Sequence, residues 1–220
     1  MNPLVCIPSP RDLPEFDHFI SKITKYDKYF AKYFYEIDAY NKLREYFLTH
    51  LEYSHLVLCA DDLLVTNEAF DILISDIEGN DYPVISGICN LTYIELNKSA
   101  TTLDIPGTAI TDYNFITKEQ IEKWRSQQKY IHQVRFNGFA LCFIRRDIVE
   151  RCPFRGGQGL DRQFGIDCNK ENIPMYVDIR AESFHIKYRM GFGMYEKMFV
   201  REKPTQCIFT PKTIIDATKQ

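Results

Sequence analysis

Two adjacent carboxylates, Asp61 and Asp62, follow an apolar run of strand length at residues 55–59. Like charges this close raise one another's pKa, so a divalent cation such as Mn²⁺ or Mg²⁺ is their natural partner. The alternative is a solvated turn in which an Asp caps the next helix. Three residues that do not cap helices separate Asp62 from Thr66, and Thr66 itself suits the start of the next helix. Asp62 is therefore not needed as the cap, and this alternative is the weaker one. The pair therefore predicts a metal site.

A histidine and a third carboxylate are further candidates for chemistry. His185 lies between Phe184 and Ile186 at a predicted strand end, where a lone histidine is more often a satisfied core residue than a metal ligand. Asp161 follows the glycine-rich residues 156–159 at the start of a predicted helix, whose positive dipole end favours the ionised carboxylate. An Asp there usually caps its helix, whereas the glycines before it suggest a mobile lid that delivers Asp161 to a substrate.

The turn after the first predicted strand is another candidate. Residues 4–7 form a short apolar run, and it is closed by Pro8, Ser9, Pro10 and Arg11. Ligands of open α/β sheets bind outside the carboxyl ends of the strands, where this turn, the paired carboxylates and the histidine are all expected. The chain contains no P-loop, dinucleotide-binding, nucleophile-elbow or zinc-type cysteine motif that would compete with this assignment.

Alternating strand and helix patterns must position these groups. Short apolar runs alternate with segments of helical spacing through the first 87 residues. This alternation implies right-handed crossovers and an α/β fold with a mixed, mostly parallel central sheet flanked by helices. Strands are expected at 4–7, 28–37, 55–59, 83–87, 134–144 and 175–179, and helices at 12–23, 38–50, 66–79, 117–129 and 160–171. Residues 1–190 are expected to form one domain and 191–220 a C-terminal tail.

The composition excludes several classes of protein. Lys and Arg number 27 and Asp and Glu 30, so the net charge is −3 and a nucleic-acid partner is not expected. The longest uninterrupted apolar stretch, residues 139–144, is too short to span a membrane. Residues 1–9 lack the charged leader and cleavage site of a signal peptide, and the seven cysteines form an odd set mostly within apolar runs. We therefore expect a cytoplasmic protein with reduced thiols.

Taken in order, these pieces resemble the GT-A glycosyltransferases, most closely the family 2 type of nucleotide-sugar transferase. Residues 5–9 look like that family's first strand and proline-containing turn, and residues 55–65 look like the strand that ends in its D-x-D motif. Asp61 and Asp62 stand at the centre and the last position of the motif, and Ala60 departs from the pattern at the first, ribose-contacting carboxylate. The resemblance implies that Asp62 holds the metal. The residues it assigns to nucleotide binding are Pro8, Ser9, Arg11, Asp61 and Asp62.

The later motifs extend the resemblance to the reaction. Residues 136–146 are similar to the family's later strand with its acceptor-side glycine, and Asp161 stands where the family has its general base, with Leu160 replacing a neighbouring acid. His185 stands where several such enzymes carry a histidine ligand to the metal. The resemblance implies metal-dependent transfer of a sugar from a nucleotide-diphosphate sugar to a hydroxyl of a saccharide, protein or lipid acceptor. A cation held by Asp62 and His185 would offset charge on the diphosphate, and Asp161 would take the acceptor proton. Inversion is favoured, because no second carboxylate is identifiable as a nucleophile.

Two other functions stay open. A sugar nucleotidyltransferase also has a similar sheet and a metal-bound Asp, but such enzymes show a glycine-rich basic loop after the first strand, and residues 8–11 contain no glycine. A non-catalytic saccharide-binding module could have kept the fold and lost the carboxylate at position 60. Metal-dependent hydrolysis of a nucleotide sugar separates the three, because a binding module gives none and a nucleotidyltransferase releases pyrophosphate.

Overall fold

Strands and helices alternate through the first 88 residues, except that the short β4 directly follows β3. The computed structural model describes residues 1–89, 98–103, 114–156, 159–186 and 203–213 of the 220-residue chain. Its first elements are β1 (Pro3–Ser9), α1 (Pro14–Ser21), β2 (Asp27–Lys32), α2 (Glu36–Thr49), β3 (His55–Leu58), β4 (Leu63–Leu64), α3 (Asn67–Asn80) and β5 (Val84–Ile88). Thr66 caps α3 by accepting a hydrogen bond from the Ala69 amide at 3.2 Å, as its position in the sequence predicts.

The second part of the chain adds shorter elements. They are β6 (Lys98–Leu103), β7 (Phe115–Thr117), α4 (Lys118–Ser126), β8 (Ile131–Phe136), β9 (Cys142–Arg145), α5 (Arg146–Arg151), α6 (Leu160–Lys170), β10 (Met175–Glu182), β11 (Phe184–His185) and β12 (Gln206–Thr210). Thr117 and Gln120 form a reciprocal capping box that begins α4. The stretch 134–144, expected as a strand, is interrupted around Asn137 and Gly138, and β8 and β9 are separate strands.

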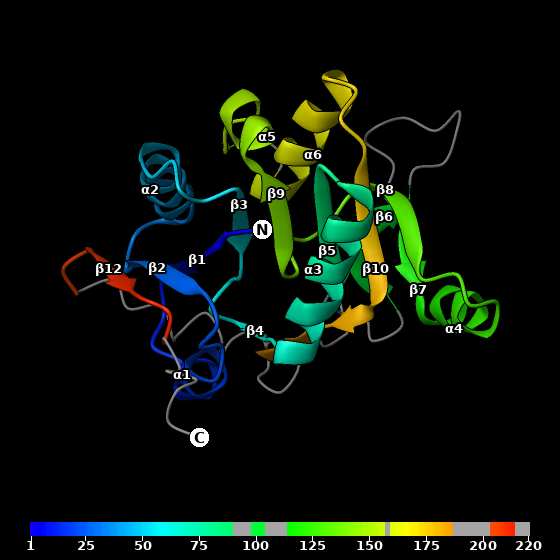
Figure 1. Cartoon of the computed structure of the whole chain (residues 1–220), viewed down its shortest axis with the longest axis horizontal. Helices are drawn as coiled ribbons and strands as arrows, with labels where there is room; N and C mark the ends of the chain where they lie inside the picture. Colours follow the sequence, from blue (N-terminus) through cyan, green and yellow to red (C-terminus); the bar gives the residue numbers. More distant parts are fainter. Residues whose placement is uncertain (90–97, 104–113, 157–158, 187–202, 214–220) are drawn as a thin grey trace.

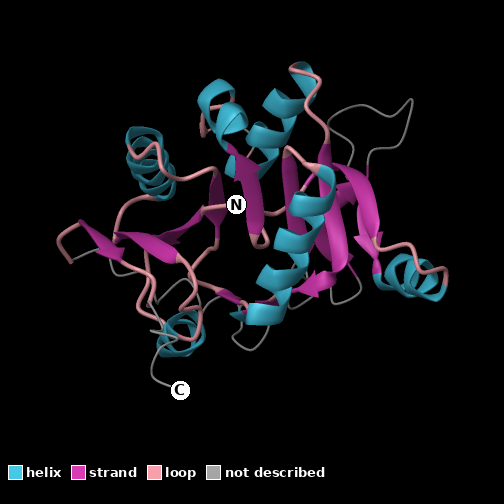
Figure 2. Ribbon diagram, in the orientation of Figure 1, coloured by secondary structure: helices cyan, strands magenta, loops and turns pink. Residues whose placement is uncertain are grey.

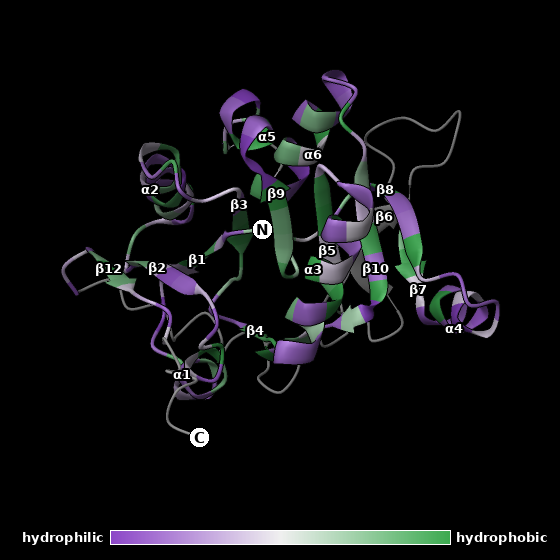
Figure 3. Cartoon of the chain, viewed as in Figure 1, coloured by the Kyte–Doolittle hydropathy of each residue, from purple (hydrophilic) through white to green (hydrophobic). Residues whose placement is uncertain are grey.

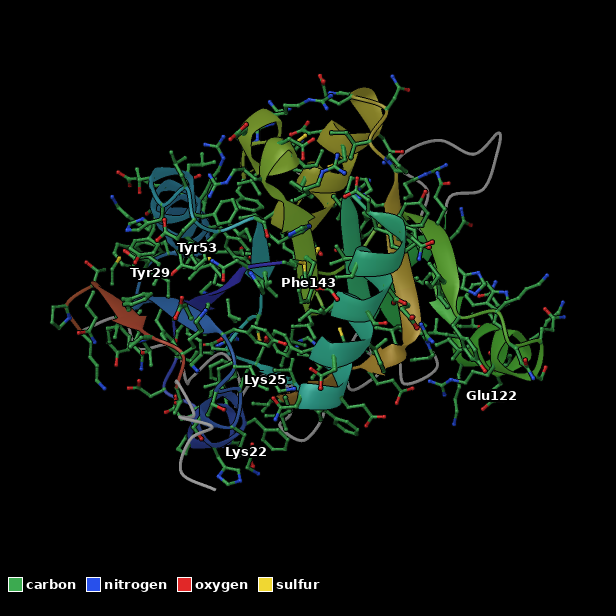
Figure 4. The ribbon with its side chains drawn as sticks, viewed as in Figure 1. Lys22, Lys25, Tyr29, Tyr53, Glu122 and Phe143 are labelled. Atoms are coloured by element: carbon green, nitrogen blue, oxygen red, sulfur yellow. The ribbon has the colours of Figure 1, made fainter. Side chains whose placement is uncertain are left out.

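The main sheet has ten described strands in the order β12-β2-β1-β3-β9-β5-β10-β8-β6-β7 (Figures 1 and 2). The expectation of a mostly parallel sheet is wrong, because parallel pairing among the described strands is confined to β1–β2, β1–β3 and β5–β10. Strand β9 enters between β3 and β5, antiparallel to both. It suits this central place because Cys142, Phe143 and Ile144 are apolar and fully buried (Phe143 is labelled in Figure 4). The alternation of strands and helices along the sequence does not indicate that a strand from later in the chain lies in the middle of the sheet.

Helices cover both faces of the sheet. Helices α2, α5 and α6 share one hydrophobic core with it, and α1 and α3 share the other. Alternate residues of β1 point to the two faces, so Leu4 and Cys6 join the first core while Val5 and Ile7 join the second. This burial on both sides explains why the β1 sequence is almost continuously apolar, and Figure 3 shows hydrophobic central strands beneath more polar helices.

The direction of the strands brings several of their carboxyl ends to the same edge of the sheet. Strands β1, β3, β5 and β10 point the same way, so their carboxyl ends lie along the same edge of the sheet. The chain passes from β1 to β2 through α1 and then back past β1 to β3 through α2. The two crossovers run in opposite directions, so the strand order reverses between β1 and β3. Ligands of open α/β sheets bind at such a reversal, which places the candidate site beyond these two strands.

Residues assigned to a C-terminal tail from the sequence add a strand to this sheet. Strand β12 pairs antiparallel with β2, with Gln206 opposite Lys32 and Thr210 opposite Lys28. It brings Cys207 to the surface, whereas the other six cysteines are buried, and all seven are free thiols. None of the described helices combines the length and the apolar character that crossing a membrane requires.

Close packing of α6 on β8 gives a testable prediction about stability. A Cβ added at Gly165 would lie 2.5 Å from the Cβ of Phe136, whereas one added at Gly79 in α3 would meet no atom within 4 Å. We expect Gly165→Ala to destabilise the fold by about 1–3 kcal/mol through overpacking. Gly79→Ala is the control and should stabilise by roughly 0.5–1 kcal/mol through helix propensity. Urea unfolding measures both, and a stabilising Gly165→Ala would contradict this packing.

Candidate functional site

A buried ion pair joins the turn after β1 to the turn after β3. Three Arg11 groups donate to the Asp61 carboxylate: the backbone N–H to Oδ2 at 3.0 Å, Nε to Oδ1 at 2.9 Å, and Nη2 to the same Oδ1. Arg11 is 6% exposed and Asp61 is 0% exposed. The main chain supports the contact, because the Asp61 amide donates to the Pro8 carbonyl at 3.3 Å. The ladder between β1 and β3 thus continues into the two turns and brings the charges together.

The charges of this pair depend on each other. Burial raises the pKa of Asp61 to about 7, and the Arg11 guanidinium opposes that rise. Burial also lowers the pKa of Arg11, but the Asp62 and Asp61 carboxylates outweigh this effect and raise it. Arg11 therefore keeps its positive charge inside the protein. Removing either side chain would leave the charge of the other one buried without an opposite charge beside it.

Asp62 and His185 meet directly beside this pair. His185 Nε2 lies 2.9 Å from Asp62 Oδ2, and Arg11 Nη1 lies 3.4 Å from the same oxygen. The two-stranded pairing of β4 with β11 sets this geometry, since it places His185 opposite Leu63, and the Ile186 amide donates to the Asp62 carbonyl at 2.8 Å. Asp62 is 5% exposed. The structure therefore brings together the two side chains that the sequence resemblance assigned to a metal.

The Asp62 and His185 side chains suit a metal ion that a bound ligand also coordinates. A carboxylate oxygen and an imidazole nitrogen 2.9 Å apart could occupy neighbouring positions on one divalent cation. No group of three or more His, Cys, Asp or Glu side chains that could hold a metal occurs in the described part of the chain. The positive charge of Arg11 lies close to the Asp62 carboxylate. It disfavours binding of a metal cation there unless a negatively charged ligand binds together with the metal. The residues fit a metal completed by phosphate oxygens and water, as Mg²⁺ commonly is.

Asp161 lies at the start of α6, as predicted. Gly159 precedes the helix with φ of +99°, and Asp161 Oδ1 accepts a hydrogen bond from the Arg162 amide at 2.7 Å. The buried Tyr40 of α2 has the Asp161 and Asp62 carboxylates among its charged neighbours. Burial raises the pKa of Tyr40 well above its usual value, and the neighbouring carboxylates, including Asp161 and Asp62, raise it further. The Tyr40 hydroxyl is thus within electrostatic reach of both groups.

The glycine-rich stretch before Asp161 is anchored on one side. Arg155 donates from Nε to Asp167 Oδ2 at 2.7 Å and from Nη2 to Oδ1 at 2.5 Å. Asp167 is 7% exposed, so this fork ties the residue before Gly156 to the body of α6. Residues 157–158 lie outside the described residues. The mobile lid expected at the glycine-rich residues 156–159 therefore stays a prediction.

Several residues that the resemblance assigns to nucleotide binding have partners within the protein. Both carboxylate oxygens of Asp61, assigned to the nucleotide, accept hydrogen bonds from Arg11. Pro8 and Ser9 contribute main-chain contacts, since the Pro8 carbonyl accepts from Asp61 and the Ser9 carbonyl accepts from Tyr33. Arg11 lies in the turn after β1, as expected from the sequence.

A second polar cluster lies on α3 and β10. Arg180 Nη2 lies 3.0 Å from Asp76 Oδ1, and Arg180 Nε lies 2.9 Å from Asp178 Oδ2. Burial raises the pKa of Asp76 to about 7, with Asp178 adding to the rise and Arg180 opposing it. A groove of about 440 Å³ here is lined by Glu68, Asp71, Ile72, Ser75, Asp76 and Arg180. It contains none of the predicted site residues, so we assign the candidate site to the edge beyond β1 and β3.

The Arg11–Asp61 pair predicts a large loss of stability on truncation. Asp61→Ala should lower the free energy of unfolding by about 3–5 kcal/mol, because Arg11 stays buried without its partner. The double variant Arg11→Met with Asp61→Leu should recover much of this loss. Asp71→Ala is the control: it removes the exposed 2.9 Å contact with Lys25 (labelled in Figure 4) and should cost about 1 kcal/mol or less. Equal losses in Asp61→Ala and Asp71→Ala would contradict this assignment.

Comparison with known proteins concerns the fold alone. No protein-family model matches the chain, and no curated protein matches its sequence. Among solved structures the chain is similar to the crystal structure of A197 from STIV, with a TM-score of 0.62 over 84% of this chain and 85% of that one. Sequence identity between the two is 17%, so the shared feature is the backbone arrangement. The fold is mixed α/β, with a large mixed sheet flanked by helices.

Proposed function

We propose that this chain is a metal-dependent GT-A-type glycosyltransferase that moves a sugar from a nucleotide-diphosphate sugar to an acceptor hydroxyl. The observation that carries the proposal is the meeting of Asp62, His185 and Arg11 beyond the carboxyl ends of β1 and β3. Residues 123 positions apart in the sequence supply the two metal donors. Such a convergence at the reversal of strand order is typical of a ligand site.

The charges in the site favour a metal–diphosphate complex over either component alone. Asp61 and Asp62 would repel a free diphosphate, and Arg11 would disfavour a free cation. When bound, the metal would neutralise negative charge on the diphosphate leaving group. Arg11, fixed by Asp61, would add a second positive charge at a constant position. The carboxylate of Asp61 thus serves the site by holding Arg11.

The proposed base is Asp161 at the start of α6. An Asp near a helix N-terminus stays ionised at neutral pH, because the positive end of the helix dipole favours the charged form. In the proposal it accepts the proton of the attacking acceptor hydroxyl as the sugar leaves the diphosphate, in a single inverting displacement.

Two observations bear on the alternative functions. A nucleotidyltransferase needs a flexible basic loop around a triphosphate, whereas Arg11 is fixed by three hydrogen bonds to Asp61. A saccharide-binding module needs no metal donors, and the Asp62–His185 contact would then serve stability alone. The acceptor, whether saccharide, protein or lipid, stays open in the proposal.

Metal and nucleotide are expected to bind together. Isothermal titration with uridine, guanosine or thymidine diphosphate should show binding in the presence of Mn²⁺ and lose it when the metal is removed with a chelator. Asp62→Asn and His185→Gln should each weaken this binding by about tenfold or more, because the first replaces a charged oxygen donor by a neutral amide and the second removes the imidazole nitrogen. Asp71→Asn, an exposed acid on α3, is the control and should bind as the parent does. Metal-independent binding, or full affinity in both site variants, would refute the assignment.

Asp161→Asn separates a catalytic base from a helix cap. The amide keeps most of the capping capacity but cannot accept the proton, so transfer should fall by roughly 10²–10⁴ in kcat. Donor affinity and melting temperature should stay near the parental values, because a lost cap would cost about 1 kcal/mol at most. Product formation with a saccharide acceptor panel measures the first quantity. A variant that transfers at the parental rate would show that Asp161 is a structural residue.

A further inference from the structure

Three polar side chains from distant parts of the chain meet beside the Arg11 turn. Asp12 Oδ1 accepts a hydrogen bond from the Tyr33 hydroxyl at 2.8 Å, and Asp12 Oδ2 accepts one from Lys203 Nζ. Lys203 Nζ also lies 5.2 Å from the centre of the Tyr33 ring, within range of a cation–π contact. Residues 12 and 203 are 191 positions apart. The contact therefore joins the C-terminal segment to the first turn of the sheet.

Strand β12 determines where Lys203 lies. Gln206 pairs with Lys32, the last residue of β2, in an antiparallel register, so residues before Gln206 extend past the carboxyl end of β2. Further contacts fasten the segment: the Lys212 amide donates to Asp27 Oδ1 at 2.7 Å and the Thr213 amide to the Thr24 carbonyl at 2.9 Å. Lys203 is thus delivered to the edge that carries the candidate site.

The cluster holds both flanks of the Arg11 turn. Asp12 directly follows Arg11, and the Tyr33 amide donates to the carbonyl of Ser9 at 2.9 Å, on the other side of the turn. Tyr33 has φ of +64°, a left-handed conformation that is uncommon for a bulky residue. Contacts on both its main chain and its ring hold Tyr33 in this conformation. A residue fixed in this way can transmit the position of the C-terminal segment to the turn.

We propose that Lys203 is a positioning residue for the candidate site, and that the segment 203–213 completes this site by fixing the turn that carries Arg11. The link to ligand binding rests on the proposed function. Lys203 and Asp12 are 50% and 37% exposed, so their ion pair contributes little to global stability. Its effect is local: without it the turn gains freedom, and the ligand must order the turn on binding.

Lys203→Met tests the proposal, with Lys212→Met as the matched control in the same segment. The Lys212 contact with Asp27 uses the backbone amide, which the control variant keeps. The first measurement is the NMR signal of the Arg11 Nε–H group in the protein without ligand. In Lys203→Met this signal should shift or broaden, whereas in Lys212→Met and in Lys203→Arg it should match the parent.

The second measurement is affinity for a nucleoside diphosphate with Mn²⁺. Lys203→Met should weaken it by about five- to tenfold, while the melting temperature changes by less than about 2 °C. An Arg11 signal in Lys203→Met that superimposes on the parental one overturns the inference. A parent protein that binds no nucleoside diphosphate overturns the proposed function instead, and the NMR comparison still tests Lys203.

Discussion

Burying a guanidinium against a carboxylate requires two turns of the chain to stand within hydrogen-bonding distance of each other. In this protein they are the turns after β1 and β3, and Arg11 and Asp61 are the charges. Because neither charge tolerates isolation at this depth, the pair fixes the relative position of both turns. Asp62 then necessarily lies beside Arg11, and the pairing of β4 with β11 brings His185 to it. This contact thus organises the part of the candidate site that contains Arg11, Asp62 and His185.

Much of the fold follows from patterns that act over short distances. The apolar runs of β1 and β3, the Thr66 cap and the start of α4 after Thr117 depend on neighbouring residues, and the sequence predicts each of them. Pairing between strands depends on residues that are far apart. The insertion of β9 between β3 and β5, and the addition of β12 beside β2, left no signal in the local pattern. The expectation of a mostly parallel sheet is wrong for this reason.

The candidate site also combines features that neighbouring residues determine with features that depend on residues far apart in the sequence. Asp62 could be singled out because paired acids are costly to leave close together without a cation, but a lone histidine such as His185 more often belongs to a core. Their 2.9 Å contact depends on a two-residue strand pairing that is too short to leave any periodicity. The pairing of Arg11 with Asp61 is equally invisible, since arginines in turns usually face water. The role of Asp161 stays a prediction, because its hydrogen bond to the Arg162 amide suits a cap as well as a base.

The place of β12 also affects how the protein is made. Strand β2 pairs with β1 on one side and with β12 on the other, and the second partner is synthesised some 175 residues later. While the ribosome translates the intervening residues, the nascent β2 presents an unpaired edge, which is a template for association between chains. Contacts of such long sequence separation also form slowly, because loop closure precedes any gain from pairing. A chaperone that shields exposed strand edges would therefore have its greatest effect before Gln206 emerges from the ribosome.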